Sequence, residues 1–258
     1  MRHSPLIPGR GLVPLAGGAA PGRVPLVAVA HGSRDPRAAA TVAALLDQVP
    51  LDVRVAYLDH CAPTLGQALH GLEEAVVLPL LLTEAYHSRV DLPAALNEAR
   101  AHQPRLRVHY GTTLGPHPLL RAALERRLAE AGVRPGDPDT AVVLVSAGSS
   151  DARANAVVSR MAREWRRGGW WTARAAYASA AGPTPAQAVA ELVRAGAPRV
   201  VLAPYLLAPG YFADKVRREA LEAGATVVAD VLGAAPELVD VLLERYEGAQ
   251  RDPVSLVG

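Results

Sequence analysis

The sequence predicts an α/β protein of two similar lobes, each a parallel sheet of about four strands flanked by helices. Apolar runs typical of buried strands alternate with segments of helical periodicity, which favours parallel sheets. The order of these segments repeats in the second half of the chain. We expect a first lobe at residues 24–133, a second at 140–248, a flexible leader at 1–23 and a tail at 249–258.

The first predicted strand, residues 26–30, is apolar throughout and ends abruptly in a polar turn. The turn reads His31-Gly32-Ser33-Arg34-Asp35 and is followed by Pro36. Proline suits the first turn of a helix, and Ser33 or Asp35 can cap it. Ligands bind beyond the carboxyl ends of strands in open parallel sheets, so His31 lies where a site is expected.

The rest of the first half alternates in the same way. Further strands are predicted at residues 52–58, 75–82 and 106–110. Helices are predicted at residues 36–49, 64–72, 91–102 and from 118 to about 131. The strand at 75–82 is apolar along its whole length, which is typical of a strand covered on both faces.

A stretch rich in proline, glycine and aspartate, residues 133–139, separates the halves, and the order then repeats. Strands are predicted at residues 141–146, 172–177, 199–207 and 226–232. Helices are predicted at residues 151–167, 184–195, 213–223 and 236–247. Two facing lobes predict a cleft between them, a common place for a ligand.

Composition excludes several classes of protein. The 258 residues are half apolar, contain one cysteine and carry a formal net charge of +2. A disulfide framework within the chain is therefore excluded, and a reducing compartment is expected. Dense basic runs and apolar stretches of about 20 residues are absent from the sequence, so neither nucleic acid nor a membrane is an expected partner. We expect a cytoplasmic protein.

Three polar residues follow the first three strands of the first half: His31, Asp59 and His87. Loops at the carboxyl ends of parallel strands share one edge, so these side chains can converge. Two imidazoles and a carboxylate suit a divalent transition metal, and either histidine can also act as a base. The second half has alanine, serine and phenylalanine at the matching places, Ala147, Ser179 and Phe212. This joint loss favours one site that only one lobe kept.

Each candidate also has a simpler structural interpretation. A histidine at a strand end can be a cap, and Asp59 can bond its own turn. His60 could replace Asp59 as a ligand, whereas Cys61 is more typical of a small buried residue. The turn after the first strand could also bind phosphate, but it lacks the glycine spacing of nucleotide loops, so no nucleotide is expected.

The motifs around these residues resemble one family. AHGSRD at His31, YLDHCAPTL around Asp59 and LPLLLTEAYHSRVDLP around His87 resemble the sirohydrochlorin chelatases of the CbiX type, a branch of the class II chelatases. The likeness covers roughly residues 24–248, as in the long, two-lobed form of that family. The residues matching His31 and His87 are its metal-handling and catalytic histidines. The position of Asp59 often carries glutamate, so the carboxylate here is one methylene shorter.

The resemblance implies insertion of Fe²⁺, Co²⁺ or Ni²⁺ into sirohydrochlorin without ATP, in sirohaem or cobalamin biosynthesis. Two pyrrole protons must leave, so a neutral imidazole is needed as base. We expect His31 and His87 to bind the metal, which is a substrate, and to accept those protons, with Asp59 as a third ligand or as a group that orients an imidazole. Ser33, Arg34 and Arg89 are expected to contact the substrate.

Two rival functions remain open. A metal or tetrapyrrole carrier of the same fold would bind its ligand without changing the absorption spectrum of the ring. A phosphate-handling hydrolase with His31 as nucleophile would not depend on His87. The internal duplication can replace a dimer of half-length chains, which favours a monomer.

Overall fold

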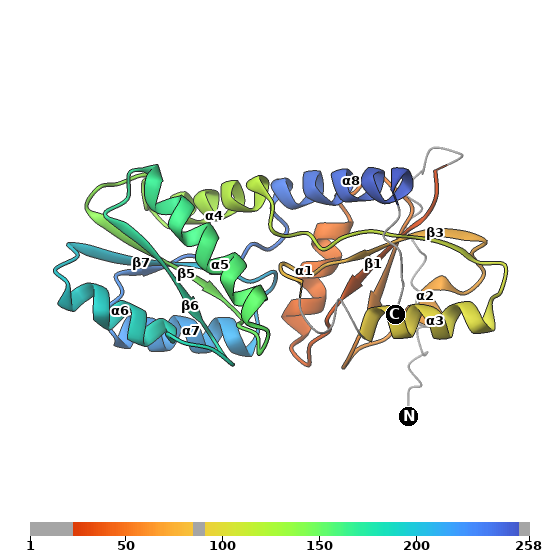
Figure 1. Ribbon diagram of the computed structural model, residues 1–258, viewed down its shortest axis with the longest axis horizontal. Helices are drawn as coiled ribbons and strands as arrows, with labels where there is room; N and C mark the ends of the chain where they lie inside the picture. Colours follow the sequence, from red (N-terminus) through yellow and green to blue (C-terminus); the bar gives the residue numbers. More distant parts are fainter. Residues whose placement is uncertain (1–22, 85–90, 253–258) are drawn as a thin grey trace, which may run out of the picture.

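Two four-stranded parallel sheets form the centre of the protein and confirm the predicted fold class (Figure 1). The computed structural model describes residues 23–84 and 91–252. The strand orders are β2-β1-β3-β4 and β6-β5-β7-β8, so the two sheets have the same topology. The first strand of each half, β1 or β5, lies inside its sheet, which places the turn that follows it near the middle of the carboxyl edge.

The elements of the first half follow the predicted order. The strands are β1 (Leu26–Ala30), β2 (Val53–Tyr57), β3 (Glu74–Pro79) and β4 (Arg107–Tyr110). The helices are α1 (Pro36–Leu46), α2 (Leu65–Leu69), α3 (Leu92–His102) and α4 (Pro118–Glu130). Strand β3 ends at Pro79, earlier than the predicted residue 82, although the Leu80 N–H still donates to the Val29 carbonyl at 2.7 Å.

The second half repeats this order. The strands are β5 (Thr140–Ser146), β6 (Thr172–Tyr177), β7 (Arg199–Tyr205) and β8 (Val227–Val228). The helices are α5 (Ala152–Trp165), the short 3-10 helix η2 (Arg166–Gly168), α6 (Pro185–Arg194), α7 (Tyr211–Glu222) and α8 (Pro236–Arg251). Strand β8 has two residues where residues 226–232 were predicted. Asp230 leaves the ladder and accepts a hydrogen bond from Arg217 at 2.8 Å.

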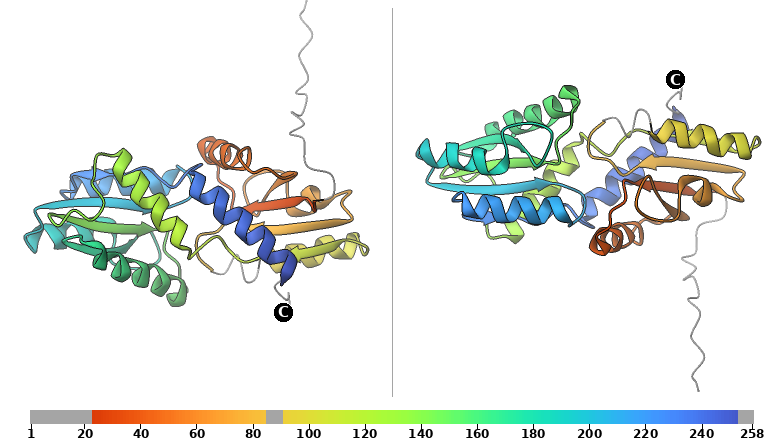
Figure 2. Two further views of the ribbon diagram at one scale, coloured as in Figure 1. Left: turned by 90° about the horizontal axis from the view of Figure 1, so that it is seen from above. Right: turned by 90° about the horizontal axis from the view of Figure 1, so that it is seen from below.

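The fourth helix of each half packs on the sheet of the other half, which sequence periodicity did not indicate. Helix α4 contacts β7 of the second sheet, whereas α8 contacts β3 and β4 of the first sheet. The two views in Figure 2 show α4 over the sheet of the second half and α8 over that of the first. Helix α8 also continues to Arg251, past residue 248 where the second lobe was expected to end, because Ala249 is buried against the first sheet.

Because of this exchange, one apolar core runs through both lobes. It joins the sheet faces covered by α1 and α8 in the first lobe and by α4 and α5 in the second. The opposite faces form two separate clusters, one beneath α2 and α3 and the other beneath α6 and α7. The two sheets are therefore held by shared burial of apolar side chains, the dominant favourable term in folding.

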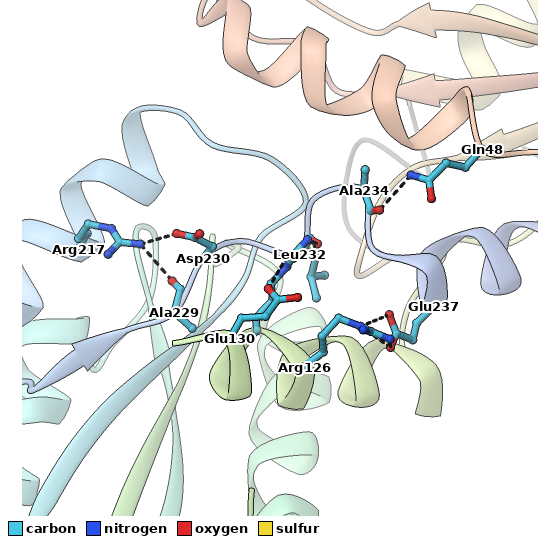
Figure 3. A network of polar contacts seen from close by, with 10 residues as sticks. Gln48, Arg126, Glu130, Arg217, Ala229, Asp230, Leu232, Ala234 and Glu237 are labelled. Atoms are coloured by element: carbon cyan, nitrogen blue, oxygen red, sulfur yellow. Dashed lines mark hydrogen bonds and ion pairs between the residues drawn. The ribbon is translucent and has the colours of Figure 1, made fainter. Parts of the chain in front are cut away.

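Polar contacts also hold the two lobes together, in addition to the shared apolar core (Figure 3). The Arg126 guanidinium of α4 donates to Glu237 of α8 at 2.7 Å, and Arg127 donates to the Leu232 carbonyl at 2.8 Å. The amide of Gln48, just after α1, donates to the carbonyl of Ala234 at 3.1 Å. These contacts link the segment before α8 and α8 itself to the first half of the chain.

Candidate active site

A cavity of about 890 Å³ lies between the carboxyl ends of the two sheets. It is lined by the turns after β1 and β5, by the segments after β3 and β7, and by the first turn of α7. Most of its apolar wall comes from small or aliphatic residues: Ala30, Ala38, Ala39, Val42, Leu80, Leu81, Leu82, Ala154, Val158, Leu206, Leu207, Ala208 and Pro209. The volume and lining are those of a site for a sizeable, largely apolar ligand.

The turn after β1 places His31 on the wall of this cavity, as the sequence predicts. Gly32 has a φ of +95°, and a Cβ there would lie 1.8 Å from the Asp59 carbonyl oxygen, so only glycine fits. The Ser33 hydroxyl accepts a hydrogen bond from the Asp35 N–H at 3.1 Å. Asp35 then caps α1 by accepting from the Arg37 N–H at 3.0 Å, which fixes the direction in which the chain leaves the turn.

The turn after β5 has the same geometry without the histidine. Gly148 has a φ of +85°, and a Cβ there would lie 2.0 Å from the Ser179 carbonyl oxygen. The Asp151 N–H donates to the Ser149 hydroxyl at 3.0 Å, and Asp151 caps α5 by accepting from the Arg153 N–H at 2.8 Å. Ala147 lines the cavity at the place that His31 occupies in the first lobe.

The loop after β2 lies beside the His31 turn, since the Asp59 N–H donates to the His31 carbonyl at 2.9 Å. The Asp59 carboxylate itself accepts from the His60 N–H at 2.7 Å and lies 3.3 Å from His60 Nε2. His60 lines the cavity, whereas Asp59 does not. The loop therefore contributes His60 to the cavity wall, and the predicted ligand Asp59 contacts this histidine from outside the cavity lining.

The remaining predicted site residues fall into two groups. Ser33 and Arg34 line the cavity, and the Ser33 hydroxyl also holds the turn. His87 and Arg89 lie outside the described residues. Within residues 23–84 and 91–252, no three histidine, cysteine, aspartate or glutamate side chains gather closely enough to hold a metal ion. His31 and His60 are the imidazoles that line the described part of the cavity.

Arg37 connects the first turn to the second lobe. Its guanidinium lies 2.6 Å from the carboxylate of Asp35 and 2.6 Å from that of Asp214, in the first turn of α7. Hydrogen bonds from Arg37 hold the pKa of the Asp35 carboxyl below its usual value. The capping residue of α1 is therefore charged at neutral pH and is linked through Arg37 to the opposite lobe.

Two tyrosines stand at the ends of strands beside the cavity. The Tyr205 hydroxyl, at the end of β7, donates to the Leu82 carbonyl of the first lobe at 2.9 Å, and burial raises the pKa of this hydroxyl. Tyr57, at the end of β2, also lines the cavity, and burial and the nearby Cys61 raise its pKa. Both phenols stay neutral around pH 7 and can serve as hydrogen-bonding groups.

Sequence reasoning did not assign an aromatic pair in the first turn of α7 to the site. Tyr211 is 73% exposed and Phe212 is 42% exposed, and both line the cavity. Their ring centroids are 5.7 Å apart and their planes cross at 65°. The signal was present in the repeat, because Phe212 takes the place of His87 in the second half.

Within residues 23–84 and 91–252, no helix is both long enough and apolar enough to cross a bilayer.

Comparison with known proteins supports both the doubled architecture and the family. A family model described as CbiX matches residues 25–131 and again residues 141–249. The sirohydrochlorin cobaltochelatase of Priestia megaterium is 29% identical over 241 residues, which cover 85% of this chain and 78% of that protein. A sirohydrochlorin ferrochelatase of the same organism is 27% identical over 229 residues, which cover 83% of this chain and 86% of that protein.

Solved structures share the fold. SirB from Bacillus subtilis with Fe³⁺ superposes with a TM-score of 0.74 at 23% identity, covering 88% of this chain and 95% of that one. SirB from Bacillus subtilis subspecies spizizenii in complex with cobalt superposes with a TM-score of 0.70 at 20% identity, covering 90% of this chain and 97% of that one. The two-lobed arrangement is therefore that of known chelatase structures.

Proposed function

Because the chain belongs to the CbiX family, we propose that it is an ATP-independent sirohydrochlorin chelatase, which inserts a divalent metal such as Fe²⁺ or Co²⁺ into the macrocycle. The observation that carries the proposal is the cavity between the lobes, with His31 on one wall and apolar residues around it. A tetrapyrrole has flat apolar faces and a rim of carboxylates, which suit such a cavity. The metal is a substrate in this reaction, and sirohydrochlorin is the small-molecule partner.

In the proposed mechanism His31 has two tasks. A neutral imidazole offers one nitrogen lone pair, with which it can bind the incoming ion or accept a pyrrole proton. One residue cannot do both at the same moment, so a second group that can bind the ion or accept a proton is required. His87 remains the sequence-based candidate for it, and His60 is the described imidazole that shares the cavity with His31.

Asp59 acts as a positioning residue in this proposal. Its carboxylate lies 3.3 Å from His60 Nε2, a contact that orients the imidazole. The shorter side chain of aspartate suits this role, because the carboxylate needs to reach only the neighbouring residue. Arg34 is proposed to contact the carboxylates of the macrocycle from the rim of the cavity, and Arg89 is proposed for the same task on sequence grounds alone.

The proposal places the protein in the cytoplasm, in sirohaem or cobalamin biosynthesis. Imidazole and carboxylate ligands accept both iron and cobalt, so the metal that reacts fastest decides between the two pathways.

The test is an anaerobic assay of the purified protein with sirohydrochlorin and Fe²⁺, Co²⁺ or Ni²⁺ in turn, with no nucleotide present. We expect the absorption spectrum of the free macrocycle to change to that of the metal complex faster than in the protein-free control. Binding of both substrates without a faster spectral change would instead identify a carrier and would overturn the proposal.

A further inference from the structure

The first turn of α7 exposes two large aromatic side chains where the second lobe meets the cavity. Tyr211 and Phe212 both line it, and they are among the few large apolar side chains that are exposed in the described part of the chain. Large exposed apolar groups that gather beside a cavity mark binding surfaces more often than single exposed residues elsewhere do.

The apolar stripe of α7 explains how Phe212 comes to be uncovered. Val216 and Ala220 follow Phe212 at helical spacing, and both are buried under the helix, with 1% and 0% exposure. Phe212 begins the same stripe but is 42% exposed, since it comes before the part of the helix that covers the sheet. Its ring therefore extends the apolar surface of α7 into the cavity.

The backbone at Gly210, just before this pair, lies close to the turn that carries His31. A Cβ on Gly210 would lie 3.9 Å from both the Ser33 hydroxyl oxygen and the Asp35 Cβ. Gly210 has φ +155° and ψ −171°, a conformation almost confined to glycine. The start of α7 therefore comes within van der Waals range of the turn that carries His31, and both segments line the cavity between the lobes.

We propose that Tyr211 and Phe212 form the contact surface for one face of the tetrapyrrole, on the part of the cavity wall that the second lobe contributes. This inference rests on the proposed function and names the residues that hold its substrate. Aromatic rings pack favourably on flat π-systems in offset or edge-to-face geometry. Because the two ring planes cross at 65°, one ring packs against the macrocycle face while the other presents its edge.

The repeat gives this pair a counterpart in the first lobe. Phe212 stands where the first half has His87, so the same place carries a potential metal ligand in one lobe and an apolar ring in the other. One face of the macrocycle therefore packs on the second lobe, and the metal arrives from the first lobe. Neither Tyr211 nor Phe212 needs to take part in proton transfer.

The test compares Tyr211→Ala, Phe212→Ala and the double variant with the wild type. The dissociation constant for metal-free sirohydrochlorin is measured by titration of its absorption, and KM and kcat are measured with Co²⁺. We expect the double variant to raise the dissociation constant and the KM for sirohydrochlorin roughly tenfold, with kcat changed less than about threefold. Phe212→Tyr, which keeps the ring, should bind sirohydrochlorin more tightly than Phe212→Ala.

Trp171→Ala is the matched control, because Trp171 is 37% exposed in the same lobe and does not line the cavity. It should leave the dissociation constant unchanged. A double variant that keeps its circular dichroism spectrum and binds sirohydrochlorin within twofold of the wild type would overturn the inference. A wild type that binds sirohydrochlorin through these rings but inserts no metal would contradict the proposed function and leave the contact surface supported.

Discussion

The turns at residues 31–35 and 147–151 have the same backbone design but different chemistry. In both, a glycine with positive φ passes close to a neighbouring carbonyl, and a serine and an aspartate fix the start of the next helix. Only the first turn carries a histidine, since Ala147 stands at the matching place. The fold therefore requires the turn but not the histidine, which has its part only in the proposed reaction.

The two turns also differ in what holds them. Asn155 donates to the Ser149 carbonyl at 2.7 Å and accepts from the Ser149 N–H at 3.0 Å. The matching residue of the first lobe is Ala39, and there the Cys61 thiol donates to the Ser33 carbonyl at 3.1 Å. The side chain that fixes the second turn is thus replaced by a small residue on the cavity wall, which leaves space beside the His31 turn.

The largest difference between the two lobes should appear on removal of the histidine. His31→Ala should lower kcat/KM for metal insertion at least about 100-fold, because both metal delivery and proton removal depend on the imidazole. His70→Ala is the control, since His70 is exposed at the end of α2 and does not line the cavity. Steady-state rates of both variants check this, and an equal loss in the two would refute a special role for His31.

Substitution of the two glycines separates the shape of the turns from their chemistry. Gly32→Ala and Gly148→Ala should each lower the free energy of unfolding by about 1–3 kcal/mol, because each side chain would have an unfavourable φ and meet a carbonyl oxygen. Gly32→Ala should also reduce kcat strongly, because it displaces His31. Urea unfolding and rate measurements test these two variants. A loss of kcat in Gly148→Ala as large as in Gly32→Ala would contradict the view that only the first turn takes part in the reaction.

The hydrogen bonds that hold the two turns should contribute differently to the free energy of unfolding. Asn155→Ala should lower the free energy of unfolding by about 1–2 kcal/mol, since it removes two hydrogen bonds. Cys61→Ala should have a smaller effect, because a thiol is a weak donor. Urea unfolding at pH 7 gives both values. A larger loss for Cys61→Ala would show that the first turn is held at least as firmly as the second.

The smallest expected effect on stability comes from the arginines that follow Asp35 and Asp151, the capping residues of α1 and α5. Arg37 joins Asp35 to Asp214, whereas Arg153, at the matching place, forms no ion pair within the described residues. Arg37→Ala should therefore lower the Tm at pH 7 slightly more than Arg153→Ala.

The difference between these two variants should depend on pH. Because Arg37 lowers the pKa of Asp35, this carboxylate contributes stability above the unfolded pKa of about 3.9, and the contribution is lost as the pH falls through the lower folded value. Thermal unfolding at pH 7 and at about pH 2 measures it. A difference that persists at the lower pH would mean that ionisation of Asp35 is not its cause.

The fold could be predicted from the sequence because each strand and helix has its own local signal. Alternating apolar segments indicated the two sheets, and the matched motifs indicated the repeat. The exchange of α4 and α8 had no such signal, since each helix has the same apolar pattern whichever sheet it covers. It rests on contacts between segments distant in sequence, those of α4 with β7 and of α8 with β3.

Only the part of the site that depends on local sequence signals could be predicted. The position of His31 follows from the strand end, which periodicity fixes. The direction of the Asp59 side chain does not, because it depends on His60, whose φ of 63° is rare for a residue other than glycine. The exposure of Phe212 depends on where the sheet ends beneath α7, which local sequence does not specify.

Under the proposed function, metal is handled at the His31 turn and not at its copy. Anomalous diffraction from crystals soaked in Co²⁺ locates the ion directly. We expect a cobalt peak within bonding distance of a His31 ring nitrogen and none at Ala147, and we expect this peak to disappear in His31→Ala. A cobalt ion bound at the Ala147 turn, or one that remains in His31→Ala, would contradict it.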